Sequence, residues 1–569
     1  MQATRSLIIG AGLGALINMA AMGAAVAQQS ADSTPPVKPP KPKSAKPSSD
    51  SSKATARELQ ALHDQVDSLQ RRLDAQTAAQ QQTQATADQA VAQAAAAKAQ
   101  AATASAAAEE IPAEVKTEVK TVADAAKPKT DKIYYKGVTL TLGGFGALES
   151  VYRTRNETAD IASSFVAIPF NNNSVGQTGE FRFSARQSRF TALAEGDPTA
   201  DIHLGFYGEF DFLGAAQTAN SNETNSYTPR IRVLYNQVDW NSIGLHLLAG
   251  QNWSLVTTQG KGITPRAEVI PLTIDAQYVP GFSFTRQPQI RLTEEFDKTF
   301  WLAVSLENPQ TTFYTGANAF PKSVQLTYNA PGGSGFDSAN TLSLNHIPDV
   351  VAKAVYEPTV ADRTLHLEVF GLYRSFYERL DQANQNVNGG GVGAGLTVPL
   401  VPGLVDFQLS GMGGKGIGRY GAAQLTDVTF DATGAIKPIS EIQALAGLIV
   451  HASPKLDLYA YAGEEKESAQ AYYLTSANGT VTGYGYGNPL YVNSGCDFEG
   501  APGACVGNTR VVEQGTAGFW CRPFGGGSFG RYQVGLQYSY TERKAFSGIG
   551  GAPVANDSMV FASFRYYPF

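Results

Sequence analysis

Residues 531–541 read RYQVGLQYSYT, and this stretch indicates the fold of most of the chain. Every second position in it is apolar or aromatic: Tyr532, Val534, Leu536, Tyr538 and Tyr540. Because successive side chains of a β-strand point to opposite faces, one face of this strand is apolar and the other polar. A transmembrane barrel, with lipid outside and water inside, requires this pattern. A soluble β-sandwich shares the alternation, but its strands are shorter and its apolar face lies inside.

The same period-two pattern recurs from about residue 133 onward, interrupted by Gly, Asn, Pro and Asp. The further candidate strands are 137–151, 180–194, 202–212, 230–240, 243–250, 284–293, 300–307, 364–377, 404–412, 443–451, 456–463 and 559–569. With short turns at one end and long loops at the other, residues 132–569 accommodate about sixteen strands, and eighteen is possible. We therefore predict an all-β transmembrane barrel of antiparallel strands.

The first 27 residues have the layout of a secretory signal peptide. Arg5 gives a basic start, Leu7–Val26 is apolar, and Ala25-Val26-Ala27 is a small-x-small cleavage site before Gln28. The alternative is an uncleaved membrane anchor. No run of about eighteen apolar residues follows, so no membrane-spanning helix is expected downstream.

Residues 28–131 differ in composition from the barrel region. Residues 28–56 form a Pro/Lys-rich linker, which should be extended and solvated. Residues 57–131 are predicted to be a periplasmic coiled-coil and Ala-rich helical segment. Its heptad positions, spaced three and four residues apart, are the candidate oligomerisation residues Leu59, Leu62, Val66, Leu69 and Leu73. The alternative is an amphipathic helix that packs on its own domain.

Charge and cysteine content narrow the class of protein. Residues 28–131 carry 13 basic and 13 acidic residues, and with Arg5 removed from the totals, 30 basic and 37 acidic residues remain, a net charge of −7. This argues against a nucleic-acid partner. Three cysteines exclude a disulfide scaffold. Cys496 and Cys505 are a possible loop disulfide, and pairing of Cys505 with Cys521 is equally permitted.

The chain ends on an aromatic residue, Phe569, which resembles the C-terminal insertion signal of porins. Its strand, 559–569, alternates imperfectly. Phe569 shares parity with Arg565 and Tyr567, whereas Phe564 and Tyr566 belong to the apolar face. A bulge near Pro568 would reconcile the two faces.

The signal peptide, the heptad Leu59–Leu73, the Ala/Gln-rich tract and a barrel that closes on Phe569 together resemble the DcaP-like outer-membrane porins. The resemblance is architectural and covers essentially the whole chain. It implies a homotrimer of sixteen-stranded barrels with N-terminal periplasmic helices. It also implies passive diffusion of small anionic solutes such as dicarboxylates.

The stretch after the fifth candidate strand, residues 252–283, resembles in place and length the third loop of trimeric porins, which narrows the lumen. Lys261, Arg266, Glu268 and Asp275 would then set the charge of the constriction. The alternative is an extracellular loop.

Arginines are concentrated in the strands around this loop. They are Arg182, Arg186, Arg189, Arg230, Arg232, Arg286 and Arg291, and with the four charged loop residues they are the candidate channel-lining or selectivity residues. Arginine stays charged and binds carboxylates in a bidentate manner. The alternative is that they pair with Glu180, Glu209 and Asp211 and stiffen the wall.

Enzyme signals are lacking. Residues 416–421, GIGRYG, fit GxGxxG without a βαβ context and indicate a turn. We expect no metal site, no cofactor and no catalytic residues. We predict an outer-membrane porin for small hydrophilic, anionic solutes, in contact with outer-membrane lipid and lipopolysaccharide. The alternatives are a tether that reaches peptidoglycan through residues 28–131 and a phospholipase-type enzyme.

Overall fold

The computed structural model describes residues 132–214, 224–225, 227–314, 316, 318–324, 326–327, 345–524 and 529–569, together with the helical Gln70. The chain divides into two units, Met1–Lys127 and Pro128–Phe569. Apart from Gln70, the predicted signal peptide, linker and heptad segment lie outside the described residues.

No helix among the described residues is long and apolar enough to cross a membrane.

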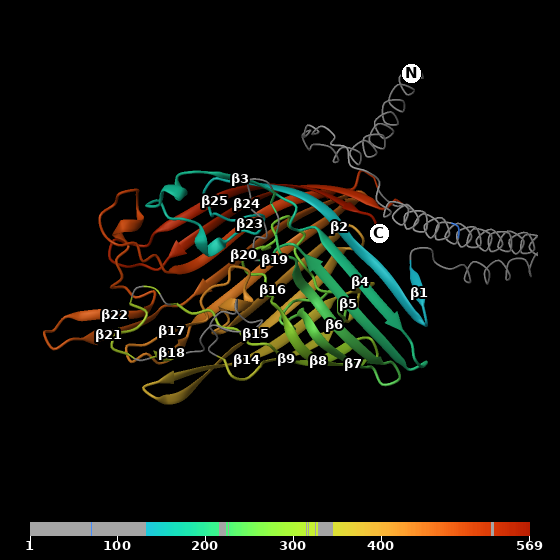
Figure 1. Ribbon diagram of the computed structural model, residues 1–569, viewed down its shortest axis with the longest axis horizontal. Coiled ribbons are helices and arrows are strands. Elements are labelled where there is room, and N and C mark those ends of the chain that lie inside the picture. Colours follow the sequence, from blue (N-terminus) through green and yellow to red (C-terminus); the bar gives the residue numbers. More distant parts are fainter. Residues whose placement is uncertain are drawn as a thin grey trace, which may run out of the picture. The chain divides into compact units, whose positions relative to one another are not determined.

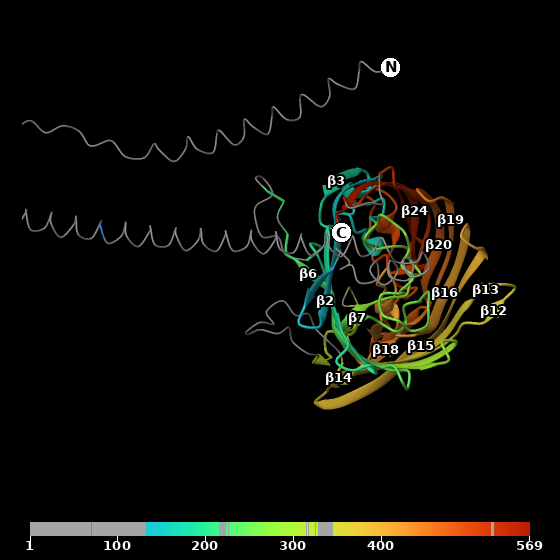
Figure 2. The ribbon, with the colours of Figure 1, turned by 90° about the vertical axis from the view of Figure 1, so that its right-hand side faces the viewer.

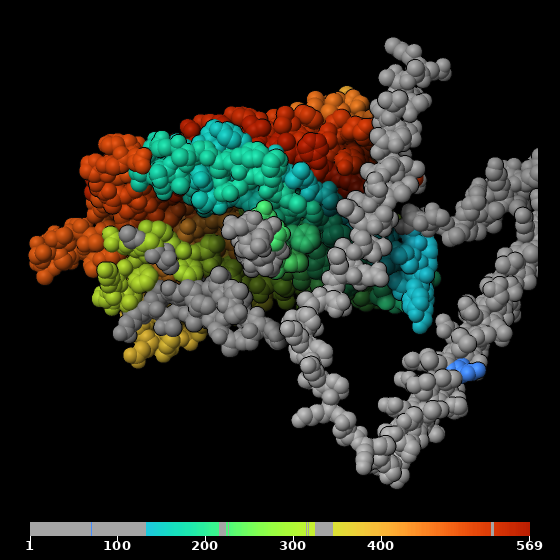
Figure 3. Space-filling view, turned by 45° about the horizontal axis from the view of Figure 1, so that its top comes forward, coloured from blue at the N-terminus to red at the C-terminus, as the bar shows by residue number. Residues whose placement is uncertain are grey.

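Sixteen antiparallel wall strands form one closed barrel (Figures 1 and 2), as the sequence predicted. Their bounds are β2 (Val138–Arg153), β4 (Arg189–Gly196), β5 (Ile202–Asp211), β6 (Arg230–Trp240), β7 (Leu245–Trp253), β8 (Arg286–Phe296), β9 (Phe300–Glu307), β11 (Asp349–Tyr356), β14 (His366–Leu380), β15 (Ala383–Val401), β16 (Val405–Lys415), β19 (Ser440–Ser453), β20 (Leu456–Glu467), β23 (Thr509–Cys521), β24 (Arg531–Ala545) and β25 (Val554–Tyr567). The barrel closes where β2 pairs with β25, with Leu148 opposite Phe564. In Figure 3 the first strands, in cyan and teal, lie directly against the last, in red.

Among the described residues, nine short strands and four single turns of 3₁₀-helix accompany the wall strands. The short strands are β1 (Ile133–Tyr135), β3 (Glu180–Ser184), β10 (Leu326–Thr327), β12 (Thr359–Val360), β13 (Arg363–Thr364), β17 (Val428–Phe430), β18 (Ile436–Pro438), β21 (Gln470–Thr475) and β22 (Val481–Tyr486). Single turns of 3₁₀-helix are η1 (Phe165–Ala167), η2 (Ser174–Gly176), η4 (Gly418–Tyr420) and η5 (Ser494–Cys496). The hairpin β21–β22 projects from the end of the barrel that carries the long loops (Figure 1).

The alternation predicted for residues 531–541 is present in β24. Tyr538 is 50% exposed on the outer face, while its neighbour Ser539 is fully buried on the inner face. Since the outer face must meet lipid and the inner face must meet polar groups, this strand satisfies both environments.

The last strand differs from the prediction. β25 ends at Tyr567, and its pairing with β24 continues to that residue without a register shift, so there is no bulge near Pro568. Phe569 lies beyond the strand and is exposed, which removes the need for it to share a face with Tyr566.

The predicted strand 180–194 is interrupted. It forms β3 and β4, separated by residues 185–188, and both pair with β2. Among the described strands β3 pairs with β2 alone, so its other edge is free.

Three wall strands, β11, β15 and β23, were absent from the predicted set. β15 contains the run 389–395, which is glycine at five of seven positions. A Cβ atom at Gly393 would come within 2.2 Å of the Phe370 ring, and one at Gly395 within 2.8 Å of Glu368. The glycines therefore leave room for inward-facing side chains of β14.

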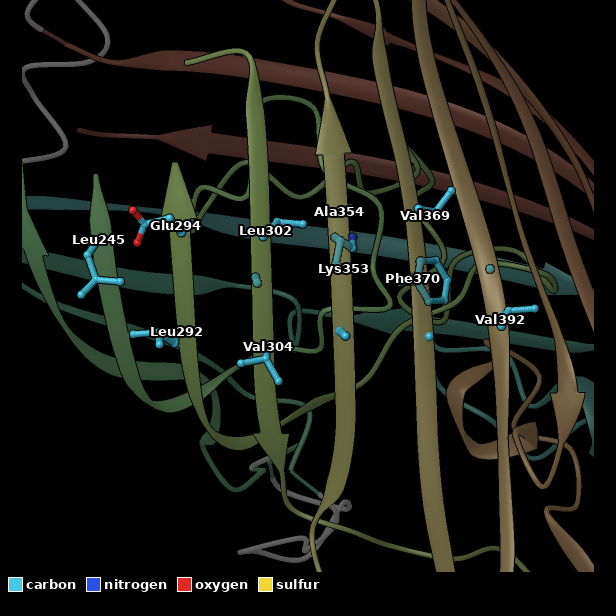
Figure 4. A pocket seen from close by; sticks show the side chains of 14 residues that line it. Leu245, Leu292, Glu294, Leu302, Val304, Lys353, Ala354, Val369, Phe370 and Val392 are labelled. Carbon is cyan, nitrogen blue, oxygen red and sulfur yellow. The ribbon is translucent and has the colours of Figure 1, made fainter. Parts of the chain in front are cut away.

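The outer wall from β7 to β15 is an apolar surface with a shallow groove. Leu292, Val304 and Val369 are exposed on it (Figure 4), and Ala352 and Gly371 are among its lining residues. Figure 4 also shows Lys353, which is buried and pairs with Glu368 Oε2 at 3.1 Å. An apolar outside and a charged inside are what a membrane-embedded wall requires.

Of the two cysteine pairings that the sequence allowed, the structure contains the disulfide Cys496–Cys505. Cys521 is a free thiol on β23.

Candidate functional site

The connection between β7 and β8, residues 254–285, crosses the interior of the barrel; we call it the inner loop. Its backbone N–H groups donate to wall side chains on widely separated strands. Gln259 donates to Glu368 of β14 at 3.1 Å, and Leu272 donates to the Tyr461 hydroxyl of β20 at 3.1 Å. Ile274 donates to Gln537 of β24 at 2.6 Å. The three acceptors are buried wall residues, so the loop lies inside the barrel and not beyond its rim.

Buried carboxylates of the wall hold the inner loop in place. Besides Glu368, Glu307 accepts from the Leu255 N–H at 3.0 Å and Glu465 accepts from the Gly281 N–H at 2.7 Å. A backbone N–H removed from water needs a partner, and an ionised acceptor gives a strong bond. The sequence did not reveal these three glutamates as loop anchors, because their partners are distant along the chain.

A second loop, residues 416–439, also lies in the interior; we call it the second inner loop. Glu465 accepts from the Ala423 N–H at 2.9 Å, and Glu467 accepts from the Thr426 N–H at 2.9 Å. The two inner loops contact each other, since Gln277 donates to the Ala422 carbonyl at 2.6 Å. The GxGxxG-like residues 416–421, for which the sequence predicted a turn, contain the single 3₁₀ turn η4.

Four of the candidate arginines gather on one side of the interior: Arg189, Arg230, Arg232 and Arg286, which we call the arginine cluster. Two wall carboxylates of β5 lie among them. Arg232 pairs with Glu209 and, at 3.1 Å, with Asp211. Arg230 pairs with Asp211 at 2.7 Å, and Arg189 lies 3.5 Å from Glu209. The pairing with Glu209 and Asp211, which the sequence offered as the alternative role of these arginines, is therefore present.

Arg286 is the member of the cluster with the weakest pairing. Its guanidinium stacks on the Trp253 ring at 4.8 Å and on Phe284 at 5.7 Å. Its Nη1 is buried and has no hydrogen-bond partner among the described residues, although the residue as a whole is partly exposed. Aromatic faces hold such a cation in position without neutralising it.

The charges of the cluster do not cancel. Four arginines face two carboxylates, Glu209 and Asp211, which leaves a net charge of +2. Arg565 of β25, which sequence reasoning missed, also lies on the inner face of the wall, where Glu149 balances its charge. It pairs with Glu149 at 2.6 Å and lies over the Trp520 ring at 4.6 Å. Because β25 continues to Tyr567 without a bulge, its side chains alternate regularly, and Arg565 points inward like Ser563.

The cluster meets the inner loop at Tyr278. Arg232 Nη2 donates to the Tyr278 hydroxyl at 3.3 Å. Burial raises the pKa of Tyr278, but Arg232, Arg286 and Arg189 together lower it further, and the resulting pKa is about 8. The lowered pKa of this loop tyrosine is therefore a consequence of the positive electrostatic potential at the wall.

The charged loop residues have different environments. Lys261 is exposed, and Arg266 lies over the Tyr207 ring at 5.4 Å with Glu195 at 3.9 Å. Glu268 is partly buried beside Gln259. Asp275 is buried and accepts from the Ser163 and Gln277 N–H groups, which makes it a structural residue of the loop.

The remaining candidate arginines lie apart from the cluster. Arg291 is buried and donates to Gln289 at 3.1 Å, so it is not open to the interior. Arg186 pairs with Asp160 at 3.0 Å, and Arg182 has a half-exposed side chain on β3. The candidate oligomerisation residues Leu59, Leu62, Val66, Leu69 and Leu73 lie outside the described residues.

Comparison with solved structures finds the outer-membrane channel DcaP of Acinetobacter baumannii, at 17% sequence identity and a TM-score of 0.52. The match covers 76% of this chain and 99% of that chain. This barrel has the fold of the DcaP channel. The DcaP-like architecture inferred from the sequence is confirmed at the level of the fold.

Two other porins match this DcaP-like barrel with lower scores. The anion-selective porin from Comamonas acidovorans is 9% identical, with a TM-score of 0.38 over 76% of this chain and 99% of its own. OmpF of Salmonella typhi, in complex with daunomycin, is 9% identical, with a TM-score of 0.39 over the same two shares. No protein-family model matches the sequence, and no curated protein matches it either.

Proposed function

We propose that this chain is an outer-membrane porin through which small hydrophilic, preferentially anionic solutes diffuse. The single observation that carries the proposal is the arginine cluster with its net charge of +2 beside the inner loop. The DcaP-like fold supports the channel part of the proposal, and the cluster supports the anion preference.

The placement of the arginine cluster favours a role in selecting anionic solutes over a purely structural role. Arg189 and Arg286 are partly exposed within the interior, whereas Arg153 and Arg374 are fully buried and paired. A partly exposed guanidinium retains its field in the adjacent water, and low-dielectric walls concentrate that field. A solute carboxylate passing Arg286 can approach the exposed part of a guanidinium that aromatic rings hold without neutralising it.

The net charge of the whole barrel region does not decide its preference. Residues beyond 131 carry more acidic than basic groups, but many carboxylates are bound to the inner loops or to arginines. What a solute meets is the local excess of arginine. We further propose that the protein assembles as a homotrimer in contact with outer-membrane lipid, with residues 28–131 in the periplasm.

Solute flux into liposomes that contain the purified full chain tests this proposal. We expect the liposomes to swell in both a neutral and an anionic sugar of equal size, and to swell faster in the anionic sugar. Arg189→Gln combined with Arg286→Gln should abolish the difference while neutral flux persists, and Arg510→Gln, an exposed residue of β23, is the matched control. Absence of all flux would contradict the channel, and an unchanged preference in the double variant would contradict the role of the cluster.

A further inference from the structure

The inner loop contains a compact segment, residues 257–269, which we call the loop tip. Two backbone hydrogen bonds, of 2.8 and 2.9 Å, join its two arms. Gln259 of the tip binds Glu368 of β14, and Arg266 lies 3.9 Å from Glu195 of β4. Both contacts are at the strand ends that lead into short turns, and six wall strands separate β4 from β14. The tip therefore lies across the interior at that end of the barrel.

His366, the first residue of β14, lies between two carboxylates that both hold the tip. Its Nδ1 is 2.8 Å from Glu357 Oε1, and its Nε2 is 3.1 Å from Glu368 Oε2. The same two oxygens accept backbone N–H groups of the tip, from Gly262 at 2.5 Å and from Gln259 at 3.1 Å. The histidine is 2% exposed, so the carboxylates and not water are its partners.

These two contacts determine how many protons the His366 ring carries. A neutral imidazole has one N–H, and its other nitrogen is an acceptor. A carboxylate oxygen opposite that bare nitrogen would place two acceptors at hydrogen-bond distance with no hydrogen between them. Both oxygens already accept backbone N–H groups, which disfavours a proton on either carboxyl group. The geometry therefore requires the imidazolium form, in which both nitrogens donate.

The charged neighbours of His366 come from three segments of the chain. Lys353 of β11 (Figure 4) donates to Glu368 Oε2 at 3.1 Å and to a carbonyl of the tip at 2.8 Å. Glu357 comes from the connection between β11 and β14, and β15 places the uncharged Thr397 opposite His366. Glu368 thus has a second cation, whereas Glu357 pairs with His366 alone among the described residues. The charged residues of the tip that no ion pair joins to His366 are Lys261, Arg266 and Glu268.

Glu357 is the anchor that a singly protonated ring would release. It is partly exposed, so water can solvate it once it loses the imidazolium. Its partner on the tip, Gly262, has a φ of +51°, and a Cβ atom there would lie 2.7 Å from the Trp301 ring. The tip therefore approaches the wall closely at this position. A buried N–H that loses its acceptor is costly, so loss of Glu357 weakens the attachment of the tip at this point.

We propose that His366 is a positioning residue of the channel. While both ring nitrogens carry a proton, the loop tip stays attached and the pore rarely closes; loss of one proton releases the tip, which then closes the pore briefly and often. The tip carries the exposed Lys261 and Arg266, so its release also moves two cations within the interior. This inference rests on the proposed function, because it takes the interior to conduct.

Single-channel recordings of the full chain from about pH 5 to 9 test the inference. In the unchanged protein, brief closures should become about tenfold more frequent as the pH rises, in keeping with the loss of one hydrogen bond to a charged group. His366→Gln should close frequently at every pH. The matched control is His451→Gln, because His451 lies at the same end of the barrel between Asp457 and Asp406, at 2.8 and 3.1 Å. It should retain the pH profile of the unchanged protein.

Glu357→Gln gives the opposite expectation and remains informative if His366→Gln does not fold. Its amide nitrogen can donate to the neutral ring while its oxygen accepts from Gly262, so closures should stay rare across the whole pH range. A purely structural role for this site would make closures more frequent in both variants. Solid-state NMR of protein labelled with ¹⁵N-histidine gives a second measure. The signal that His366→Gln lacks should show two protonated nitrogens where closures are rare, and should change over the same pH range as the closures.

A pH profile that His366→Gln shares with the unchanged protein would overturn the inference. So would a ring with one proton at a pH where closures are rare. Hydrogen–deuterium exchange of residues 257–269, compared at one pH, does not depend on conduction and should be faster in His366→Gln than in His451→Gln. Faster exchange without any conductance would refute the channel alone, and an open channel with equal exchange in the two variants would refute the role of His366 alone.

Discussion

Tyr278 of the inner loop accepts a hydrogen bond of 3.3 Å from Arg232 of β6, and this contact joins the loop to the arginine cluster. Arg232 also contacts Glu209 and Asp211, so one guanidinium connects two wall carboxylates and the loop. The position of the loop and the charge of the wall are therefore coupled through a single residue.

The first prediction concerns the pH dependence of selectivity. Because the pKa of Tyr278 is about 8, the phenol should lose its proton near that pH and add one negative charge beside Arg232. Anion preference should fall as the pH rises through about 8. Tyr278→Phe should keep its preference up to pH 9, and the reversal potential measured from pH 6 to 9 checks both.

The same pKa has a consequence for stability. The folded-state pKa lies below the ordinary value of 10, so between about 8 and 10 the unfolded chain binds a proton that the folded chain lacks. Stability should therefore rise with pH across this window relative to Tyr278→Phe. Urea unfolding at pH 7.5 and 9.5 checks the sign, and an equal change in both proteins would contradict it.

The second prediction concerns Glu465, which accepts from Gly281 of the inner loop and from Ala423 of the second inner loop. Glu465→Ala leaves two buried N–H groups without an acceptor, which should cost about 2–6 kcal/mol at roughly 1–3 kcal/mol each. We expect a lower free energy of unfolding, noisier conductance and faster proteolysis within residues 254–285.

Glu465→Gln retains an acceptor oxygen, so its free energy of unfolding should be close to that of the unchanged protein. Glu464→Ala alters the neighbouring, exposed residue of the same strand and serves as the control. If Glu464→Ala and Glu465→Ala behaved alike, the anchoring role of Glu465 would be wrong.

The barrel architecture could be predicted because it depends on the alternation of apolar and polar residues along each strand. β24 shows this, since Tyr538 and Ser539 occupy the faces that their chemistry demands. Three strands were missed where the alternation is weak. In β15 the run of glycines obscures the alternation of apolar and polar residues. These glycines make room for Phe370 and Glu368 of the neighbouring strand, a requirement that only the three-dimensional structure shows.

The interior was predicted less completely. Clustered arginines and the length of the connection after β7 were visible in the sequence. The second inner loop was missed because its Gly-rich start resembles an ordinary turn. Glu368 and Glu465 bind backbone groups 109 and 184 residues away, respectively, and no local pattern encodes such partners.

The third prediction concerns Arg286, which is held by Trp253 and Phe284 and is partly exposed. If a solute carboxylate binds this group, Arg286→Gln should weaken block of the channel by a dicarboxylate about tenfold, in keeping with the roughly 1.5–3 kcal/mol of a charge-assisted hydrogen bond. Current recordings with added dicarboxylate measure this. Equal block in Arg286→Gln and Arg510→Gln would exclude Arg286 from the solute path.

The fourth prediction concerns the cysteines. Without reductant, a maleimide should label one thiol per chain, Cys521, in the denatured protein. After reduction three thiols should react, because Cys496 and Cys505 are then free. Peptide mapping of the labelled site checks the pairing, and label on Cys496 before reduction would contradict it.

The most direct test of the central claim is the zero-current potential of single channels in planar bilayers under an about tenfold KCl gradient at pH 7. The arginine cluster predicts an open channel whose potential has the sign of the chloride equilibrium potential, and a shift toward zero in Arg189→Gln with Arg286→Gln. A potential of the opposite sign, or no open conductance, would contradict the account.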